Sequence, residues 1–351
     1  MSSIQYHKQL ELRDPVVIAA FGGWSDAADS ATTAVKFLVD RWKSEKIAEI
    51  EAEDFYVFTE TRPTVKFGDG MLRTIVWPSN QFLAQHMEDF ERDVILFTGV
   101  EPQLKWKMFS NAFLEVCNHF SASEVIFLGS LLADVPHSVI VPITGSSSDS
   151  SMLERLREID IHSSRYEGPT GMVGVLHEAC QRMDIPSATF WAASPHYLAA
   201  TPNVKVTAAL LTHLNAFLSL GLDLSKIQSD ALRFEEQVTA LVARDPEASA
   251  YVRRLEEQLA RGEDDDDEER SYLDRPVGTG PLPSADSLIR NVEEMLRKQR
   301  ESNGKPDLDD DPDDDLDDSL DADLDDDLDD DLDDSLDAVL DDDPDDDLDA
   351  L

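Results

Sequence analysis

The sequence is poor in the residues that mark secreted, zinc-binding or membrane-spanning chains. Only two of its 351 residues are cysteines, Cys117 and Cys180, and neither belongs to a CxxC or Cys/His spacing. This pattern excludes a disulfide framework and is typical of a reducing compartment. Residues 1–14 lack the pattern of a signal peptide, and no apolar run approaches the roughly 18 residues of a membrane span. We therefore expect a soluble, cytoplasmic protein that does not enter a membrane.

Cations are scarce as well. The chain has 30 Lys and Arg against 74 Asp and Glu, and its formal net charge at pH 7 is -44. The stretch from Pro306 to Leu351 holds 27 of the Asp residues and no Lys, Arg, His or aromatic residue. Nucleic-acid phosphates and anionic membrane surfaces are bound by patches of Lys and Arg. The composition thus argues against both as partners.

Common catalytic and nucleotide-binding motifs are missing too. No G-x-G-x-x-G opens a helix, no Gly-Lys-Ser/Thr ends a phosphate loop, and neither G-x-S-x-G nor H-E-x-x-H occurs. Dinucleotide binding, a serine triad and a zinc protease site are therefore not expected. We predict no cofactor and no metal, and the lack of a nucleophile motif favours a non-enzymatic role.

Short apolar runs alternate with helical patterns through the first two thirds of the chain. The runs, which read as strands buried on both faces, lie at Val16 to Phe21, Val94 to Phe97, Val125 to Leu128 and Ser187 to Trp191. Apolar residues at helical spacing follow at 35–42, 104–120, 151–159 or 171–183, and 204–220. Strands separated by helices predict a parallel sheet covered by helices on both faces, which is a three-layer α/β fold.

Two further features predict that the sheet is mixed, although mainly parallel. Gly68-Asp69-Gly70 separates the apolar segments 64–67 and 72–77, which is typical of a β-hairpin that extends or flanks the sheet. Ser138 to Ile143 is expected to add another strand.

The rest of the chain divides by composition. We assign residues 1–222 to an α/β core domain and residues 223–262, with stripes of apolar residues at helical spacing, to a helical hairpin packed on the core. Residues 263–283 are an acidic and Gly/Pro-rich linker. The helical spacing of the apolar residues in the segment 284–300 predicts an amphipathic helix that packs on this core or on a partner. Its apolar residues are Leu288, Ile289, Val292, Met295 and Leu296.

Residues 301–351 form an Asp/Leu low-complexity tail in which Leu recurs every fourth residue from Leu316 to Leu340. Each repeat turns a helix by about 400°, so successive Leu side chains drift by about 40° and form no lasting stripe. Asp is a poor helix former, and like charges four residues apart repel. We predict that the tail is disordered and acts either as an acidic segment that keeps the protein soluble by charge repulsion or as a binder of cations or a basic partner. A specific Ca²⁺ site is not expected, because the tail lacks the glycines of such motifs.

Polar residues follow each predicted strand, at the edge where an α/β sheet binds its ligands. Those that would line a common cleft are Gly22, Gly23, Asp26, Glu101, Asp134, His137 and His196, with Glu167 on a fifth loop and Arg62 as the nearest cation. Carboxylates outnumber cations there, which suits sugar hydroxyls, amines or a divalent ion better than a bare phosphate. No residue is assigned a catalytic role.

Each of these residues also has a purely structural interpretation. Asp26 or Ser25 is suited to capping the helix that follows. His137 and His196 both follow a proline and are equally suited to a hydrogen bond with the backbone or to acid/base work. Glu101 and Glu167 lie beside prolines or glycines in turns that commonly face solvent. The residues alone leave both interpretations open.

Six ordered motifs together resemble the bacterial, mainly actinobacterial, branch of the proteasome assembly chaperone 2 family. They are Ala20-Phe21-Gly22-Gly23-Trp24-Ser25-Asp26-Ala27, Arg62-Pro63, Gly99-Val100-Glu101-Pro102, Ala133-Asp134-Val135-Pro136-His137, Gly168-Pro169-Thr170-Gly171 and Ser194-Pro195-His196-Tyr197. Pro281-Leu282-Pro283-Ser284 resembles the C-terminal segment of that branch. The likeness spans roughly residues 1–300, and the tail lies outside it.

The resemblance implies a phosphorylase/hydrolase-like α/β fold, like that of purine nucleoside phosphorylases, and self-association into a homo-oligomer. Eukaryotic and archaeal relatives assist proteasome assembly and dock through a C-terminal hydrophobic-Tyr-any tripeptide, whereas this chain ends Asp349-Ala350-Leu351. We therefore expect a non-enzymatic assembly-chaperone-like or scaffold protein that binds protein partners. The alternative is a protein of nucleoside phosphorylase-like type that binds or hydrolyses a small molecule.

Overall fold

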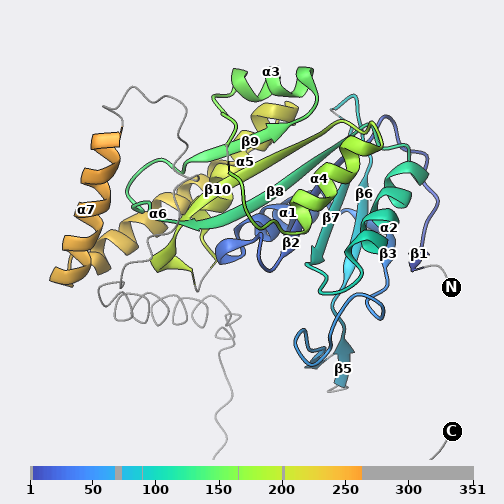
Figure 1. Cartoon of the computed structure of the whole chain (residues 1–351), viewed down its shortest axis with the longest axis horizontal. Coiled ribbons are helices and arrows are strands. Elements are labelled where there is room, and N and C mark those ends of the chain that lie inside the picture. The colour runs from blue at the N-terminus through green and yellow to red at the C-terminus, as the bar shows by residue number, and fades with distance from the viewer. Residues whose placement is uncertain (1–2, 68–72, 89, 165, 200–201, 263–351) are drawn as a thin grey trace, which may run out of the picture. The chain divides into compact units, whose positions relative to one another are not determined.

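The computed structural model describes residues 3–67, 73–88, 90–164, 166–199 and 202–262 (Figure 1). The linker 263–283, the amphipathic helix 284–300 and the tail 301–351 that the sequence predicts lie outside the described residues. No helix in the described part of the chain is both long and apolar enough to cross a bilayer.

An eight-stranded mixed sheet forms the centre of the fold, in the order β1-β3-β6-β7-β2-β8-β10-β9. The strands are β1 (Ile4–Tyr6), β2 (Val16–Gly22), β3 (Glu45–Ile50), β6 (Asn80–Gln85), β7 (Val94–Val100), β8 (Glu124–Ala133), β9 (Ile143–Ser147) and β10 (Ser187–Pro195). The four apolar runs of the sequence are β2, β7, β8 and β10, which lie next to one another as parallel neighbours. Their continuous hydrophobicity follows from burial on both faces.

The expectation of a mainly parallel sheet is wrong for the outer strands. Among the described strands of this sheet, three neighbouring pairs are parallel and four are antiparallel. The sequence interpretation missed β1, β3 and β6 because these strands are short or alternate between buried and half-exposed residues. The expected strand at Ser138 to Ile143 is also wrong, since the chain pairs only from Ile143 onward, after Pro142, which has no N–H to donate to a ladder.

The hairpin around residues 64–77 forms as predicted but makes a small sheet of its own. Strands β4 (Thr64–Phe67) and β5 (Arg73–Val76) pair only with each other in the described structure. Figure 1 shows β5 apart from the main sheet. All eight residues of the two strands are exposed.

Helices cover both faces of the main sheet because successive strand residues point to opposite sides. Val16 and Ile18 of β2 face a core shared with α1 (Ser30–Trp42), α3 (Ser150–Glu158) and α5 (Val204–Leu218), whereas Val17 and Phe21 face α2 (Trp106–His119) and α4 (Met172–Arg182). Both segments that the sequence offered as alternatives, 151–159 and 171–183, are helical. The α/β fold with flanking helices is therefore as predicted.

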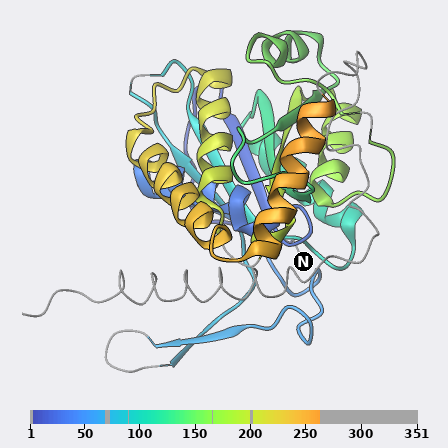
Figure 2. The same cartoon turned by 90° about the vertical axis from the view of Figure 1, so that its left-hand side faces the viewer.

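A third, smaller core joins the last two helices to the end of β10. Helix α6 (Ser225–Val242) packs on α5 through Ile227, and α7 (Pro246–Gly262) follows it closely in the chain (Figure 2). Phe234 and Val238 of α6 bury Tyr197 and Leu198 together with residues of α7. The carboxyl end of β10 is thus covered by apolar side chains.

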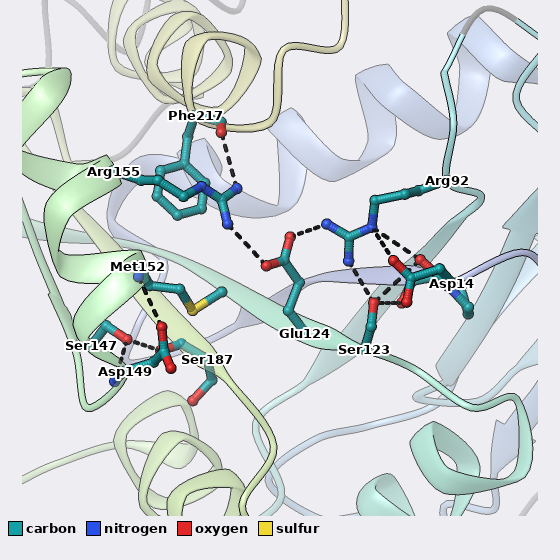
Figure 3. Close-up of polar contacts among 11 residues, drawn as sticks. Asp14, Arg92, Ser123, Glu124, Ser147, Asp149, Met152, Arg155, Ser187 and Phe217 are labelled. Atoms are coloured by element: carbon teal, nitrogen blue, oxygen red, sulfur yellow. Dashed lines mark hydrogen bonds and ion pairs between the residues drawn. The ribbon is translucent and has the colours of Figure 1, made fainter.

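Ion pairs join elements at the opposite, amino edge of the sheet. Glu124, the first residue of β8, lies between two guanidinium groups, with Arg92 Nη1 at 2.5 Å and Arg155 Nη1 at 3.1 Å (Figure 3). Arg155 also stacks on the Phe217 ring, with its Cζ 4.0 Å from the centroid. Because Glu124 is almost completely buried, this pairing satisfies a carboxylate that would otherwise be costly.

Candidate functional site

The four parallel strands end at the same edge of the sheet. Gly22, Val100, Ala133 and Pro195 are the last residues of β2, β7, β8 and β10. The candidate residues after these strands therefore lie along one edge, as the sequence predicts. The neighbours of each side chain decide what it does there.

Asp26 caps the first crossover helix. Its Oδ1 accepts the N–H of Ala31 at 2.6 Å, and its Oδ2 accepts the hydroxyl of Thr32. Only 5% of Asp26 is exposed, and burial raises the pKa of its carboxyl although these hydrogen bonds oppose the rise. Of the two interpretations of Asp26, the geometry supports the capping one.

Glu101 caps helix α4, which is far from it in the sequence. Its Oε1 accepts the N–H of Met172 at 2.7 Å, and its own N–H donates to Gly22 O at 2.8 Å. Gly23, next to Gly22, has a φ of 120°, a conformation that favours glycine. The helix dipole favours a carboxylate at this position. The hydrogen bond from the Glu101 N–H to Gly22 O explains why Gly22, Gly23 and Glu101 lie together.

The sequence offered Ser25 only as an alternative helix cap, and its hydroxyl is buried without a described hydrogen-bond partner. A Cβ placed on Gly171, just before α4, would lie 2.6 Å from both Ser25 Oγ and Glu101 Oε1. Trp24, 59% exposed, lies against the same point. The Gly-Gly-Trp-Ser-Asp motif was the only sequence signal for this arrangement.

His137 is held between Tyr197, which follows β10, and α6. Its Nδ1 lies 2.9 Å from Tyr197 Oη, and its Nε2 lies 3.1 Å from Thr239 Oγ1. Burial, assisted by the nearby Lys205 ammonium, lowers the pKa of His137 to about 4. The ring is therefore neutral at pH 7, and it satisfies both partners when its proton is on Nε2.

His196 and Asp134 form a second polar pair on the same side. His196 Nδ1 lies 3.3 Å from Asp134 Oδ1, within ion-pair distance but not aligned as a hydrogen bond. His196 Nε2 lies 3.1 Å from the hydroxyl of Tyr251 in α7. Burial raises the pKa of Tyr251 to about 12, so this hydroxyl is protonated at pH 7. The contact between His196 and Tyr251 joins α7 to the segment that follows β10.

Lys205 also belongs to this region and was missed. Its Nζ donates to the carbonyl oxygens of His137 and Val139, at 2.6 and 2.7 Å, and lies 2.7 Å from Glu235 Oε2. A single Lys among the apolar residues at the start of α5 was the available signal. Lys205 holds the loop after β8 against α6.

The two remaining candidates, Arg62 and Glu167, have no contact with the others in the described part of the chain. Both side chains are exposed.

Little open space remains beside His137. The cavity lined by His137, Lys205 and Phe234 has a volume of about 10 Å³, roughly what one water needs. In the described ranges no three His, Cys, Asp or Glu side chains gather closely enough to hold a metal ion. The arrangement is therefore suited to fastening helices at the sheet edge.

Comparison with known proteins agrees with this architecture. The model of the PAC2 family matches residues 20–242. The chain belongs to the PAC2 family. The matched region includes Asp26, Glu101, His137 and His196 and ends with α6, so that Tyr251 of α7 lies beyond it.

Solved structures of PAC2 family proteins extend the match. A PAC2 family protein from Streptomyces avermitilis is 39% identical, with a TM-score of 0.62 over 68% of this chain and 100% of that one. A proteasome-assembly chaperone homologue from Mycobacterium tuberculosis is 38% identical, with a TM-score of 0.61 over 68% of this chain and 99% of that one. These matches confirm the actinobacterial resemblance that the sequence motifs predicted.

More distant structures share the fold alone. An archaeal proteasome activator from Pyrococcus furiosus is 17% identical, with a TM-score of 0.56 over 69% of this chain and 99% of that one. The search of curated proteins gives no match. For this PAC2 family member, the roles of the candidate residues stay predictions that rest on the geometry above.

Proposed function

We propose that this chain is a non-enzymatic, assembly-chaperone-like or scaffold protein that holds protein partners, built on a phosphorylase/hydrolase-like fold. The observation that carries the proposal is that the polar candidate residues at the sheet edge already contact other parts of the chain. Asp26 and Glu101 accept hydrogen bonds from helix N-termini, and His137 and His196 contact α6 and α7. A substrate would have to displace these contacts before it met a free acid or base.

Kinship supports the same role. The Mycobacterium tuberculosis relative described as a proteasome-assembly chaperone homologue matches along 99% of its own length. We extend the assembly-type role to this chain and propose that its partners bind the α/β surface and the segment 284–300. The partner-binding residues of that segment would be Leu288, Ile289, Val292, Met295 and Leu296.

Affinity capture with the full chain from native lysate tests the role of the sheet edge. We expect His196→Gln and Glu101→Gln to retain the proteins that the wild type captures, because both residues act within the chain. Circular dichroism melts of both variants check that they are folded. A folded variant that loses its partners would contradict the proposal.

The role of segment 284–300 needs a matched pair of variants. Val292→Asp places a charge on the predicted apolar face, whereas Ser287→Asp places it on the opposite side of the helical pattern. We expect Val292→Asp to lose the captured partners and Ser287→Asp to keep them. Equal capture by both variants would remove this segment from the proposed partner surface.

A small-ligand site is the second candidate function, and the buried, unpaired hydroxyl of Ser25 favours it. A ligand that stacks on Trp24 and donates to Glu101 would lie next to this hydroxyl. Thermal shift with a panel of nucleosides and sugars separates the two functions. A shift that Ser25→Ala abolishes would support ligand binding, and the absence of any shift or turnover would exclude it.

A further inference from the structure

A pocket lies between the segment that follows β3 and the segment that follows β5. It has a volume of about 420 Å³, and its lining includes Glu49, Glu51, Glu53, Phe58 and Trp77. Small-molecule sites in proteins measure roughly 300–1,000 Å³, so this volume is enough for a small organic ligand. None of the candidate residues at the sheet edge lines the pocket, which is therefore separate from the site described above.

Two aromatic side chains form an apolar wall of the pocket. The rings of Phe58 and Trp77 meet edge to face, with their centroids 4.9 Å apart. Phe58 also packs against the core on the α2 and α4 side of the sheet, whereas Trp77 remains 50% exposed. The face of a Trp ring attracts cations more strongly than that of any other side chain. The wall is therefore suited to an apolar group or to a cation.

Carboxylates decide between these two kinds of ligand. Among the described residues that line the pocket, none is Lys, Arg or His, whereas three are Glu. Glu49 is already paired with Lys46 and lies 3.7 Å from His7 Nε2. Its charge is therefore offset within the chain.

Glu51 and Glu53 have no such cationic partner within the described residues. Glu51 Oε1 accepts a hydrogen bond from the neutral amide of Gln5 at 2.5 Å, and no ion pair of the described chain includes Glu53. Both glutamates are exposed. Neighbouring carboxylates repel each other, and a cation beside them is attracted by both. The pocket thus holds two negative charges that a bound cation offsets.

We propose that this pocket binds an organic cation, namely an alkylated ammonium group on a small apolar body. The ammonium lies against the Trp77 ring with Glu51 and Glu53 beside it, and the alkyl groups pack on Phe58. A bare metal ion does not suit the site, because the carboxylates of the described pocket do not gather closely enough to hold one. The proposal is independent of the proposed function, because it rests on different residues.

Isothermal titration calorimetry of the full chain at physiological salt tests the site. The probes are choline and a short peptide with a central trimethyl-lysine, each beside its neutral analogue in which carbon replaces the ammonium nitrogen. We expect saturable binding of the cations, and binding of the neutral analogues that is weaker by at least about tenfold. Failure of both cations to bind, or equal affinity for a cation and its neutral analogue, would overturn the proposal.

The two probes also separate the two sources of this chemical group. Choline represents a free small molecule, and the peptide represents a side chain of another protein. Tighter binding of choline would support the site as one for a small molecule, and tighter binding of the peptide would support it as one for a protein side chain. The Asp-rich tail is present in every sample, and its weak attraction for monovalent cations is screened at this salt.

Substitutions in the pocket show whether binding occurs there. Trp77→Ala and the double variant Glu51→Gln/Glu53→Gln should each weaken cation binding by at least about tenfold, whereas Trp77→Phe should retain most of it because Phe also offers a ring face. Glu154→Gln/Glu158→Gln is the matched control, because both residues are exposed on α3 and neither lines the pocket. Circular dichroism melts check that each variant is folded. Unchanged cation binding by Trp77→Ala or by the Glu51/Glu53 variant would refute the proposed site.

Discussion

The neutral, buried imidazole of His137 makes stability depend on pH. Its folded-state pKa is about 4, against an ordinary value of 6.5. Between these two values the unfolded chain binds a proton that the folded chain does not, so lowering the pH favours unfolding. The stabilising contribution is complete above pH 6.5 and is lost progressively as the pH falls toward 4.

The size of the effect follows from the two pKa values. The linkage relation gives a loss of about 0.8 kcal/mol at pH 6 and about 2 kcal/mol at pH 5. A typical domain is stable by about 5–15 kcal/mol, so this loss is readily measured.

Urea unfolding of the wild type and of His137→Gln at pH 7.5, 6 and 5 is the assay. Gln stays uncharged throughout, so the variant should lose about 2 kcal/mol less than the wild type between pH 7.5 and 5. The carboxyl of Asp26, whose pKa is raised, titrates in both proteins and cancels in the comparison. His162→Gln is the control, because its side chain is 76% exposed. Parallel curves for the wild type and His137→Gln would refute the reasoning.

Three further predictions, which use four substitutions, test the packing around the sheet. Asp93→Asn removes a charge from a side chain that is fully buried among hydrogen-bond donors. It should lower the free energy of unfolding by about 3 kcal/mol, which is about 6–12 °C in Tm. Asp54→Asn, in an exposed ion pair, should lower the free energy of unfolding by less than about 1 kcal/mol. Equal Tm values for the two variants would contradict this. Glu101→Ala should cost about 1 kcal/mol through loss of the α4 cap, and hydrogen exchange should rise in the first turn of that helix and nowhere else. Gly145→Ala should cost about 1–3 kcal/mol, since its Cβ would lie 2.7 Å from Thr189 O, and an unchanged Tm would show that the strands shift to accept it.

The sequence predicted the centre of the fold well because a strand that is buried on both faces appears in the sequence as a nearly continuous run of apolar residues. The runs that became β2, β7 and β8 are apolar at every position, and in the run that became β10 only Ser187 and Thr189 are polar. The outer strands were missed because their pattern is weaker. Strand β6, for instance, alternates buried and half-exposed residues, and its partners β3 and β7 lie in different parts of the chain.

The candidate site shows the same division. Sequence alone determined which polar residues follow the parallel strands, because strand ends are local, and its motifs determined the family. Only the tertiary structure decided their neighbours. Glu101 meets Met172 across 71 residues of sequence, and His137 meets Thr239 across 102. Whether a side chain caps a helix, packs beneath one or faces an open cleft depends on such distant contacts, which local patterns of hydrophobicity and charge do not record.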